Sequence, residues 1–223
     1  MRDLGIKLKA RYPLGLLLYA AASFAAYAYL ALHPPQGRTS YAELFYPLGM
    51  NYTIVTAYLY GTNRLGREMI HPYCVIRYRR KLRLYVRSVR LLLPLSAAFA
   101  LAQLALMLYA GGGDFSWFAW AGIVFGLCGL GALSSMLTLL LGNRLYSFLA
   151  LFLALGFDCM VAAGYFPLLE TSAFYSGLTM LALARPAEIS LACAMLFVKG
   201  GLVFGIGCLL FAFRDARGNP QKE

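Results

Sequence analysis

The stretch SWFAWAGIVFGLCGLGALSSMLTLLL, residues 116–141, carries no charged side chain. A helix that crosses a hydrocarbon core of about 30 Å needs about 20 mainly apolar residues, so this stretch is long enough to span a membrane. Lipid cannot pair with backbone N–H and C=O groups, and the stretch does not alternate apolar and polar residues, which excludes a β-barrel strand. It therefore predicts a transmembrane α-helix.

The same length criterion identifies five further apolar segments, which cover residues 13–32, 45–61, 91–110, 146–168 and 189–213. The first is longer than the usual apolar region of a signal peptide, about 7–15 residues, and is interpreted as a retained helix. The 223 residues are 61% hydrophobic and 13% charged, a composition that would leave large apolar patches on a water-soluble protein. We therefore predict an all-α, polytopic membrane protein with six transmembrane helices in a single domain.

The basic residues predict the orientation of this domain. If both termini lie in the cytoplasm, every Lys and Arg outside the six segments faces inward except Arg38 and Arg185. Cytoplasmic loops of membrane proteins carry an excess of Lys and Arg. We therefore expect a multi-pass protein of the cell membrane with both ends inside, and we attribute much of the net charge of +11 to topology and not to nucleic-acid binding.

The longest hydrophilic insert, residues 62–90, contains most of these basic residues. Its second half predicts an amphipathic helix that continues into the segment 91–110, where Pro94 could introduce a kink. Residues 1–12 have a similar design and predict an interfacial helix on the inner leaflet. Attraction to anionic lipid, about 1 kcal/mol for each basic residue, could explain the charge of both elements. The apolar and acidic residues around Glu68 and Met69 suit a docking surface for a protein partner instead.

The sequence holds no motif for catalysis or for a cofactor. It lacks the phosphate-binding loop of ATPases and the His-Glu-x-x-His zinc motif, and its two histidines, His33 and His71, lie on opposite sides of the predicted membrane. Ser134 and Ser135 have no histidine at their depth to activate them. The five cysteines have no spacing typical of disulfides or zinc sites. We therefore predict no catalytic residue, no metal site and no cofactor in this chain.

Polar side chains inside the predicted spans are a second group of candidates. Asp158 and Lys199 fall at similar depths in the fifth and sixth spans, so we predict an intramembrane charge pair, either a structural clamp or a part of a substrate path. The second span is unusually polar, and its side chains could line a pathway or a dimer face or could form interhelical hydrogen bonds. These second-span residues are Asn51, Tyr52, Thr53, Thr56 and Tyr60.

This layout resembles the permease subunits of ABC-2-type transporters. The resemblance rests on the N-terminal interfacial helix, the six spans with both ends inside, and the cytoplasmic segment GTNRLGREMIHPYCVIRYRRKLRLYVRS between the second and third spans. It implies that residues 62–90 form a coupling region and that PLLETSAFYSGLTMLALARPAE, residues 167–188, forms an outer re-entrant hairpin. The implied contact surface with the partner comprises Arg67, Glu68, Met69, Ile70, His71, Tyr73, Arg77, Tyr78 and Arg79.

The resemblance also implies the partners and the function. The chain would form a homodimer, or pair with a similar permease, and bind two copies of a separate ABC ATPase subunit that holds ATP and Mg²⁺. It would then be an exporter of a peptide, a lipid or a small antibiotic, and not itself an enzyme. The alternative is a membrane scaffold or signalling regulator that binds anionic lipid through its basic helix. A membrane-embedded lipid enzyme is a third hypothesis, which the missing catalytic groups disfavour.

Overall fold

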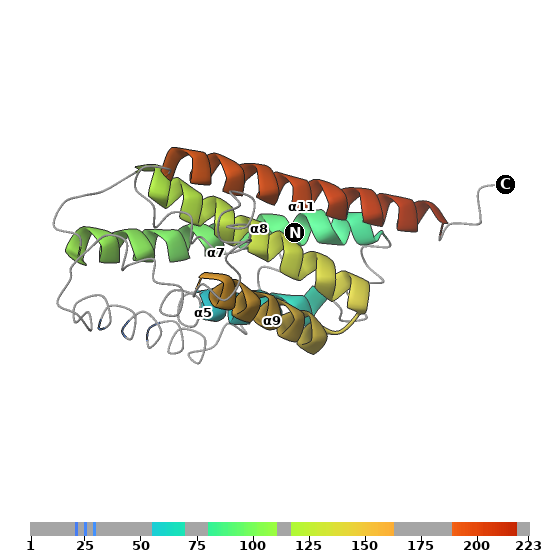
Figure 1. Ribbon diagram of the computed structural model, residues 1–223. Coiled ribbons are helices and arrows are strands. Elements are labelled where there is room, and N and C mark those ends of the chain that lie inside the picture. The colour runs from blue at the N-terminus through green and yellow to red at the C-terminus, as the bar shows by residue number, and fades with distance from the viewer. Residues whose placement is uncertain are drawn as a thin grey trace.

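The computed structural model describes residues 21, 25, 29, 55–69, 80–110, 117–162 and 189–217, with all five regular elements helical (Figure 1). No strand occurs in these ranges, which confirms the all-α prediction for the described part of the chain. Side chains at 67–69, 104, 106–110, 119, 158–159, 161–162 and 216–217 are outside the description. The helices are α5 (Thr56–Met69), α7 (Lys81–Ala110), α8 (Trp117–Leu141), α9 (Arg144–Ala162) and α11 (Ile189–Arg217).

Three of these helices are long and apolar enough to cross a membrane. The candidate spans are Lys81–Gln103 in α7, Trp120–Leu141 in α8 and Ile189–Asp215 in α11. The apolar part of α9, Arg144–Phe157, is shorter. The described residues therefore belong to a helical membrane protein.

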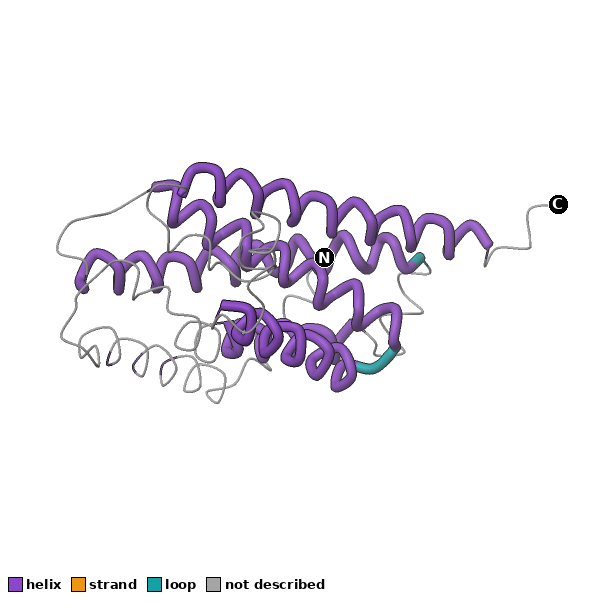
Figure 2. The backbone as a smooth tube through the Cα atoms, viewed as in Figure 1, coloured by secondary structure: helices purple, strands orange, loops and turns teal. Residues whose placement is uncertain are grey.

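The helices pack around α8, which contacts all four others. Helix α11 lies along α8 and α7 on one side, whereas α9 and α5 lie against α8 and against each other on the opposite side (Figures 1 and 2). One apolar core joins α5, α7, α8, α9 and the start of α11 around Tyr58, Leu127 and Leu196. A second core, around Tyr85 and Phe211, joins α7 to α11. Burial of these side chains in two clusters fixes how the helices are arranged.

Helix bounds differ from the predicted spans at α5 and α7. Helix α5 continues to Met69, eight residues beyond the predicted end of the second span at Gly61. Helix α7 begins at Lys81 and runs through Pro94 to Ala110, so the predicted amphipathic helix and the third span form one continuous helix. Both helices thus extend into the insert 62–90 and leave only 70–80 between them. A charged residue ends the apolar run from which a span is predicted, but the helix itself continues past that residue.

The other predicted elements agree with the structure or lie outside it. Helix α8 coincides with the predicted segment 116–141, and α11 begins at the predicted residue and ends at Arg217. Helix α9 begins at Arg144, two residues before the predicted start of the fifth span. In the predicted first span, the described residues Ala21, Ala25 and Tyr29 are helical. The interfacial helix 1–12 and the outer hairpin 167–188 lie outside the described residues.

A two-residue turn joins α8 to α9. Gly142 has a positive φ of 62°, a conformation that favours glycine, and its N–H donates to the carbonyl of Thr138 over 3.0 Å. Asn143 then caps α9, because its Oδ1 accepts from the N–H of Leu145 over 2.9 Å. This turn, the end of α5, the start of α7 and the end of α11 lie at one end of the bundle, here called the basic end (Figure 1).

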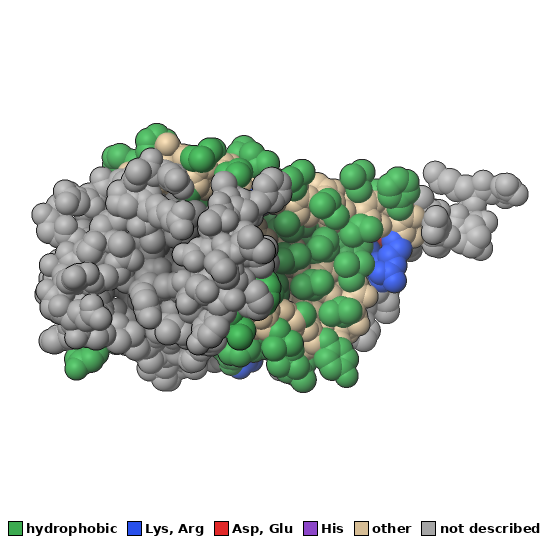
Figure 3. Space-filling view, in the orientation of Figure 1, with side chains coloured by type: hydrophobic (Ala, Val, Ile, Leu, Met, Phe, Trp, Pro, Cys, Tyr) green, Lys and Arg blue, Asp and Glu red, His purple; other side chains and the backbone are tan. Residues whose placement is uncertain are grey.

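The outer surface of α11 is apolar. Only 17% of its candidate span is buried within the chain, compared with 56% for the central helix α8. The described surface is mostly hydrophobic in the space-filling view, with basic side chains visible beside the C-terminal end of α11 (Figure 3). The exposed large side chains of α11 are Leu191, Phe197, Val198, Leu202, Ile206, Leu209, Leu210 and Phe213. Such a face is suited to lipid or to another transmembrane helix.

Candidate functional site

Buried hydroxyl groups connect α5 to both of its long neighbours. Tyr58 of α5 shares a hydrogen bond of 2.8 Å with Ser96 of α7, and Thr62, one turn later, shares one of 3.0 Å with Ser134 of α8. All four side chains are buried. The hydroxyls of Thr62 and Ser96 also lie within hydrogen-bonding distance of carbonyls in their own helices. This buried hydroxyl cluster ties three helices together inside the apolar core.

Each interhelical bond of this kind stabilises a membrane protein modestly, by about 0.6 kcal/mol on average and up to about 1.7. An unpaired hydroxyl in an apolar core costs free energy, so a shift of α5 that separated these pairs would be unfavourable. The pairs therefore fix the register of α5 against α7 and α8. Ser134, considered above as a nucleophile, is instead bonded to Thr62. The hydroxyl cluster is thus a packing device at the centre of the bundle.

The interhelical hydrogen bonds described for α5 come from residues other than the predicted polar residues of the second span. Tyr58 and Thr62, which make them, were not among the predicted residues; their spacing of four, which places them on one helical face, could have indicated them. Tyr60 accepts hydrogen bonds from the Arg64 guanidinium at 3.1 and 3.4 Å, and Thr56 is half-buried. The predicted residues Asn51, Tyr52 and Thr53 lie outside the described residues. The pathway or dimer role of this face stays a prediction.

Lys199 lines an apolar cavity of about 300 Å³ between α8 and α11. Around it, Gly129 and Gly200 bring the two backbones close, since a Cβ added to Gly129 would lie 3.2 Å from the Gly200 Cα. Gly201 and Gly205 of α11 have open space around them, since an added Cβ would meet nothing within 4 Å. The close approach of the two backbones therefore uses the face of α11 that carries Gly200.

The predicted partner of Lys199, Asp158, belongs to α9, and its side chain lies outside the described residues. The pair was inferred from an expected contact between the fifth and sixth spans. That contact is not among the principal packings of the described helices, because α9 packs on α8 and α5 whereas α11 packs on α8 and α7. The Asp158–Lys199 pair stays a prediction.

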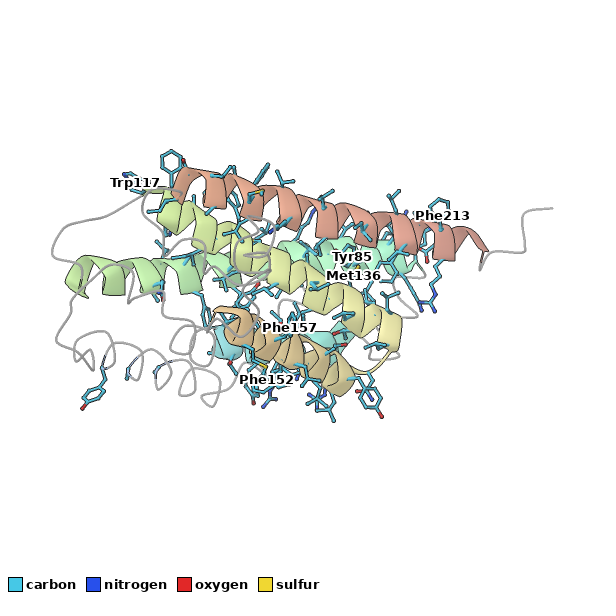
Figure 4. The ribbon with its side chains drawn as sticks, in the orientation of Figure 1. Tyr85, Trp117, Met136, Phe152, Phe157 and Phe213 are labelled. Carbon is cyan, nitrogen blue, oxygen red and sulfur yellow. The ribbon has the colours of Figure 1, made fainter. Side chains whose placement is uncertain are left out.

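An aromatic junction joins the first half of α7 to α11. The Tyr85 ring lies 5.8 Å from the Phe204 ring and 5.3 Å from the Phe211 ring, measured between centroids. Gly207 leaves the space that Tyr85 occupies, since a Cβ there would come within 2.5 Å of the phenol oxygen. Tyr85 points into the bundle, whereas Phe213 points away from it (Figure 4). The junction locks α7 and α11 side by side near the basic end.

Asp215 completes this junction by capping α7 from another helix. Its Oδ1 accepts from the backbone N–H of Lys81 and its Oδ2 from that of Leu82, each over 3.0 Å. These are the first two N–H groups of α7, which have no partner inside their own helix. A carboxylate at this position also suits the positive end of the helix dipole. The end of α11 therefore holds the start of α7.

The helices that meet at the basic end carry many basic side chains. The described ones at the basic end are Arg64, Arg80, Lys81, Arg83, Arg87, Arg90, Arg144 and Arg214. Among described side chains, Asp215 is the only acidic group. Two of the arginines, Arg64 and Arg144, line a cavity of about 330 Å³ together with Tyr60, Asn63 and Leu145. The basic end is therefore strongly cationic, and part of its charge surrounds a cavity.

The predicted docking surface for a partner falls in the gap between α5 and α7. Arg67, Glu68 and Met69 form the last turn of α5, but their side chains lie outside the described residues. The remaining predicted contacts lie entirely outside them: Ile70, His71, Tyr73, Arg77, Tyr78 and Arg79. The helices on either side of this gap, α5 and α7, both reach the basic end.

No group of three potential metal ligands occurs among the described residues. The described cysteines, Cys128, Cys193 and Cys208, are free thiols. Comparisons of the chain with protein-family models, with curated proteins and with solved structures find no match.

Proposed function

We propose that the chain is the membrane-spanning permease subunit of an ATP-binding-cassette transporter, driven by a separate ATPase. The observation that carries this proposal is α7, one helix that extends from the basic end deep into the bundle. A rigid helix that begins outside the membrane and continues as a span can transmit a push from a partner into the transmembrane core.

The contacts of α7 support this role. Asp215 and the aromatic junction couple the start of α7 to α11, and Ser96 couples its middle to α5. A displacement applied near Lys81 would therefore move α11 and strain the hydroxyl cluster at the same time. A displacement of one helix can change the shape of a bundle only if other helices move with it. The contacts of α7 with α5 and α11 meet this requirement.

The proposed topology has six spans with both termini in the cytoplasm of a cell-membrane protein. The basic end would then be the cytoplasmic side, because Lys and Arg are enriched in cytoplasmic loops. ATP and Mg²⁺ would be held by two copies of the partner ATPase, docked on residues 67–79. Export of a peptide, a lipid or a small antibiotic is the transport class that we propose, and it rests on the resemblance in layout.

Docking is tested by co-purifying the chain with a candidate ABC ATPase. The alanine variant of Glu68, Met69, Ile70 and Tyr73 should lose the ATPase from the purified complex and lose stimulated ATP turnover. The control, Arg83→Ala and Arg90→Ala, alters exposed residues of α7 and should retain both. If the quadruple variant assembles and hydrolyses ATP like the parent, residues 67–79 are not the docking surface.

We also propose a dimer, built either from two copies or with a similar permease, through the outer face of α11. Gly201 and Gly205 have space for a second helix, and small residues four apart let helix backbones approach closely in lipid. Gly201→Leu should convert the purified dimer to monomer, as measured by light scattering in detergent. Gly156→Leu, at an equally open position on α9, is the matched control. A dimer that survives Gly201→Leu contradicts this interface.

The second candidate function is a non-transporting scaffold or regulator that binds anionic lipid. The exposed residues Arg80, Lys81, Arg83 and Arg90 favour it, since each basic residue near an anionic surface contributes about 1 kcal/mol of attraction. The two functions differ in their partner. Specific co-purification of an ABC ATPase supports the permease, whereas binding to anionic vesicles without any ATPase partner supports the scaffold.

A further inference from the structure

A cavity of about 330 Å³ opens toward the basic end where the middle of α5 meets the first turn of α9. It is lined by Tyr60, Asn63 and Arg64 from α5 and by Arg144 and Leu145 from α9. All of these except Leu145 carry a polar or charged side chain. A polar cavity at the end of an otherwise apolar bundle points to a ligand with polar groups of its own.

The described residues that line this cavity carry positive charge only. Arg64 and Arg144 are both half-buried, and no described carboxylate pairs with either, because Asp215 caps α7. Tyr60 holds Arg64 in place through the hydrogen bond of 3.1 Å and through its ring, 5.6 Å from the guanidinium carbon. Two partly desolvated guanidiniums on one cavity form a site for an anion, and planar guanidiniums match phosphate oxygens in geometry.

The remaining groups refine the chemistry of the ligand. The first turn of α9 borders the cavity, and the positive end of a helix dipole also favours an anion. Asn63 also lines the cavity, and its buried Oδ1 accepts no hydrogen bond from the described residues. A phosphate ester would supply the negative charge that the two guanidiniums favour.

We infer that this cavity, between Arg64 of α5 and Arg144 of α9, binds a phosphate group carried either by an anionic lipid or by a soluble phosphate ester. The lipid source fits the surroundings, since Leu145, Tyr146 and Leu149 present exposed apolar surface on α9 next to the cavity. Acyl chains could lie on that surface while the headgroup phosphate enters the cavity. The inference is independent of the proposed transport role.

The test measures binding of defined probes to the full-length chain purified in neutral detergent. One arm titrates short-chain phosphatidylglycerol, a second titrates glycerol 3-phosphate, and diacylglycerol without phosphate is the blank. The variant Arg64→Gln/Arg144→Gln and its two single components are compared with Arg214→Gln, which removes one charge from an exposed residue of α11 outside the cavity. A further variant, Leu145→Trp, narrows the cavity without changing its charge and alters a side chain that is 55% exposed, so it is expected to fold.

Loss of two charge-assisted hydrogen bonds should weaken binding at least about tenfold in the cavity variant. The control should bind within about twofold of the parent, and Leu145→Trp should bind more weakly than the parent. Binding of phosphatidylglycerol alone identifies a lipid site, and binding of glycerol 3-phosphate as well identifies a site for soluble esters; both outcomes support the inference. Equal losses in the cavity and control variants, or no binding of either phosphate probe, would overturn it.

Discussion

Asp215→Ala removes both hydrogen bonds by which the end of α11 caps α7. The backbone N–H groups of Lys81 and Leu82 would each lose an acceptor at 3.0 Å. Loss of an N-cap side chain costs about 0.5–2 kcal/mol, and a carboxylate near a helix N-terminus adds its interaction with the dipole. One of the two bonds is exposed to solvent and the other half-buried, so we expect a destabilisation of about 1–2 kcal/mol.

Two measurements test this value. The midpoint of thermal unfolding in detergent should fall by roughly 2–8 °C for a chain of this length. Hydrogen exchange at the Lys81 and Leu82 amides should accelerate by roughly 5–30-fold, the factor that corresponds to 1–2 kcal/mol. Asp215→Asn retains an acceptor oxygen and should show an intermediate effect.

Arg214→Gln is the matched control, because it changes the charge of an exposed neighbour on α11 by one unit and leaves both hydrogen bonds intact. It should exchange and unfold like the parent chain. Unchanged exchange at Lys81 and Leu82 in Asp215→Ala would refute the interhelical cap and leave the aromatic junction as the described coupling of α7 to α11.

Two further predictions concern contacts between helices. A double-mutant cycle with Tyr58→Phe and Ser96→Ala should give a coupling free energy of unfolding in detergent of about 0.6 kcal/mol, up to about 1.7. Purely additive losses of stability would mean that the two hydroxyls are not in contact. Gly207→Ala should destabilise by about 1–3 kcal/mol because its Cβ would clash with Tyr85, whereas Gly156→Ala, with nothing within 4 Å, should be neutral; equal melting temperatures would contradict the packing of α7 on α11.

Apolar runs predict helices well when they end at strong local breaks. The segment 116–141 became α8, which stops at Leu141 before the positive-φ glycine Gly142. Helix α11 likewise begins at Ile189, the residue at which the predicted sixth span begins. Hydropathy placed the end of a helix too early where the helix continues beyond its apolar residues, as α5 does through Arg64. The Arg64 guanidinium donates a hydrogen bond to the Tyr60 hydroxyl one turn earlier. A charged side chain at that position can reach polar partners without unwinding the backbone.

The sequence by itself determined that the chain is a helical membrane protein, where α8 and α11 begin, and that basic residues gather in residues 62–90. These are properties of local composition, set by the cost of placing charge and unpaired backbone in lipid. Only the tertiary structure decided that α8 lies at the centre, that Thr62 meets Ser134, and that Asp215 reaches the start of α7. Such pairings join residues 72 to 134 positions apart, and they depend on which helix faces fit together, which no single segment encodes.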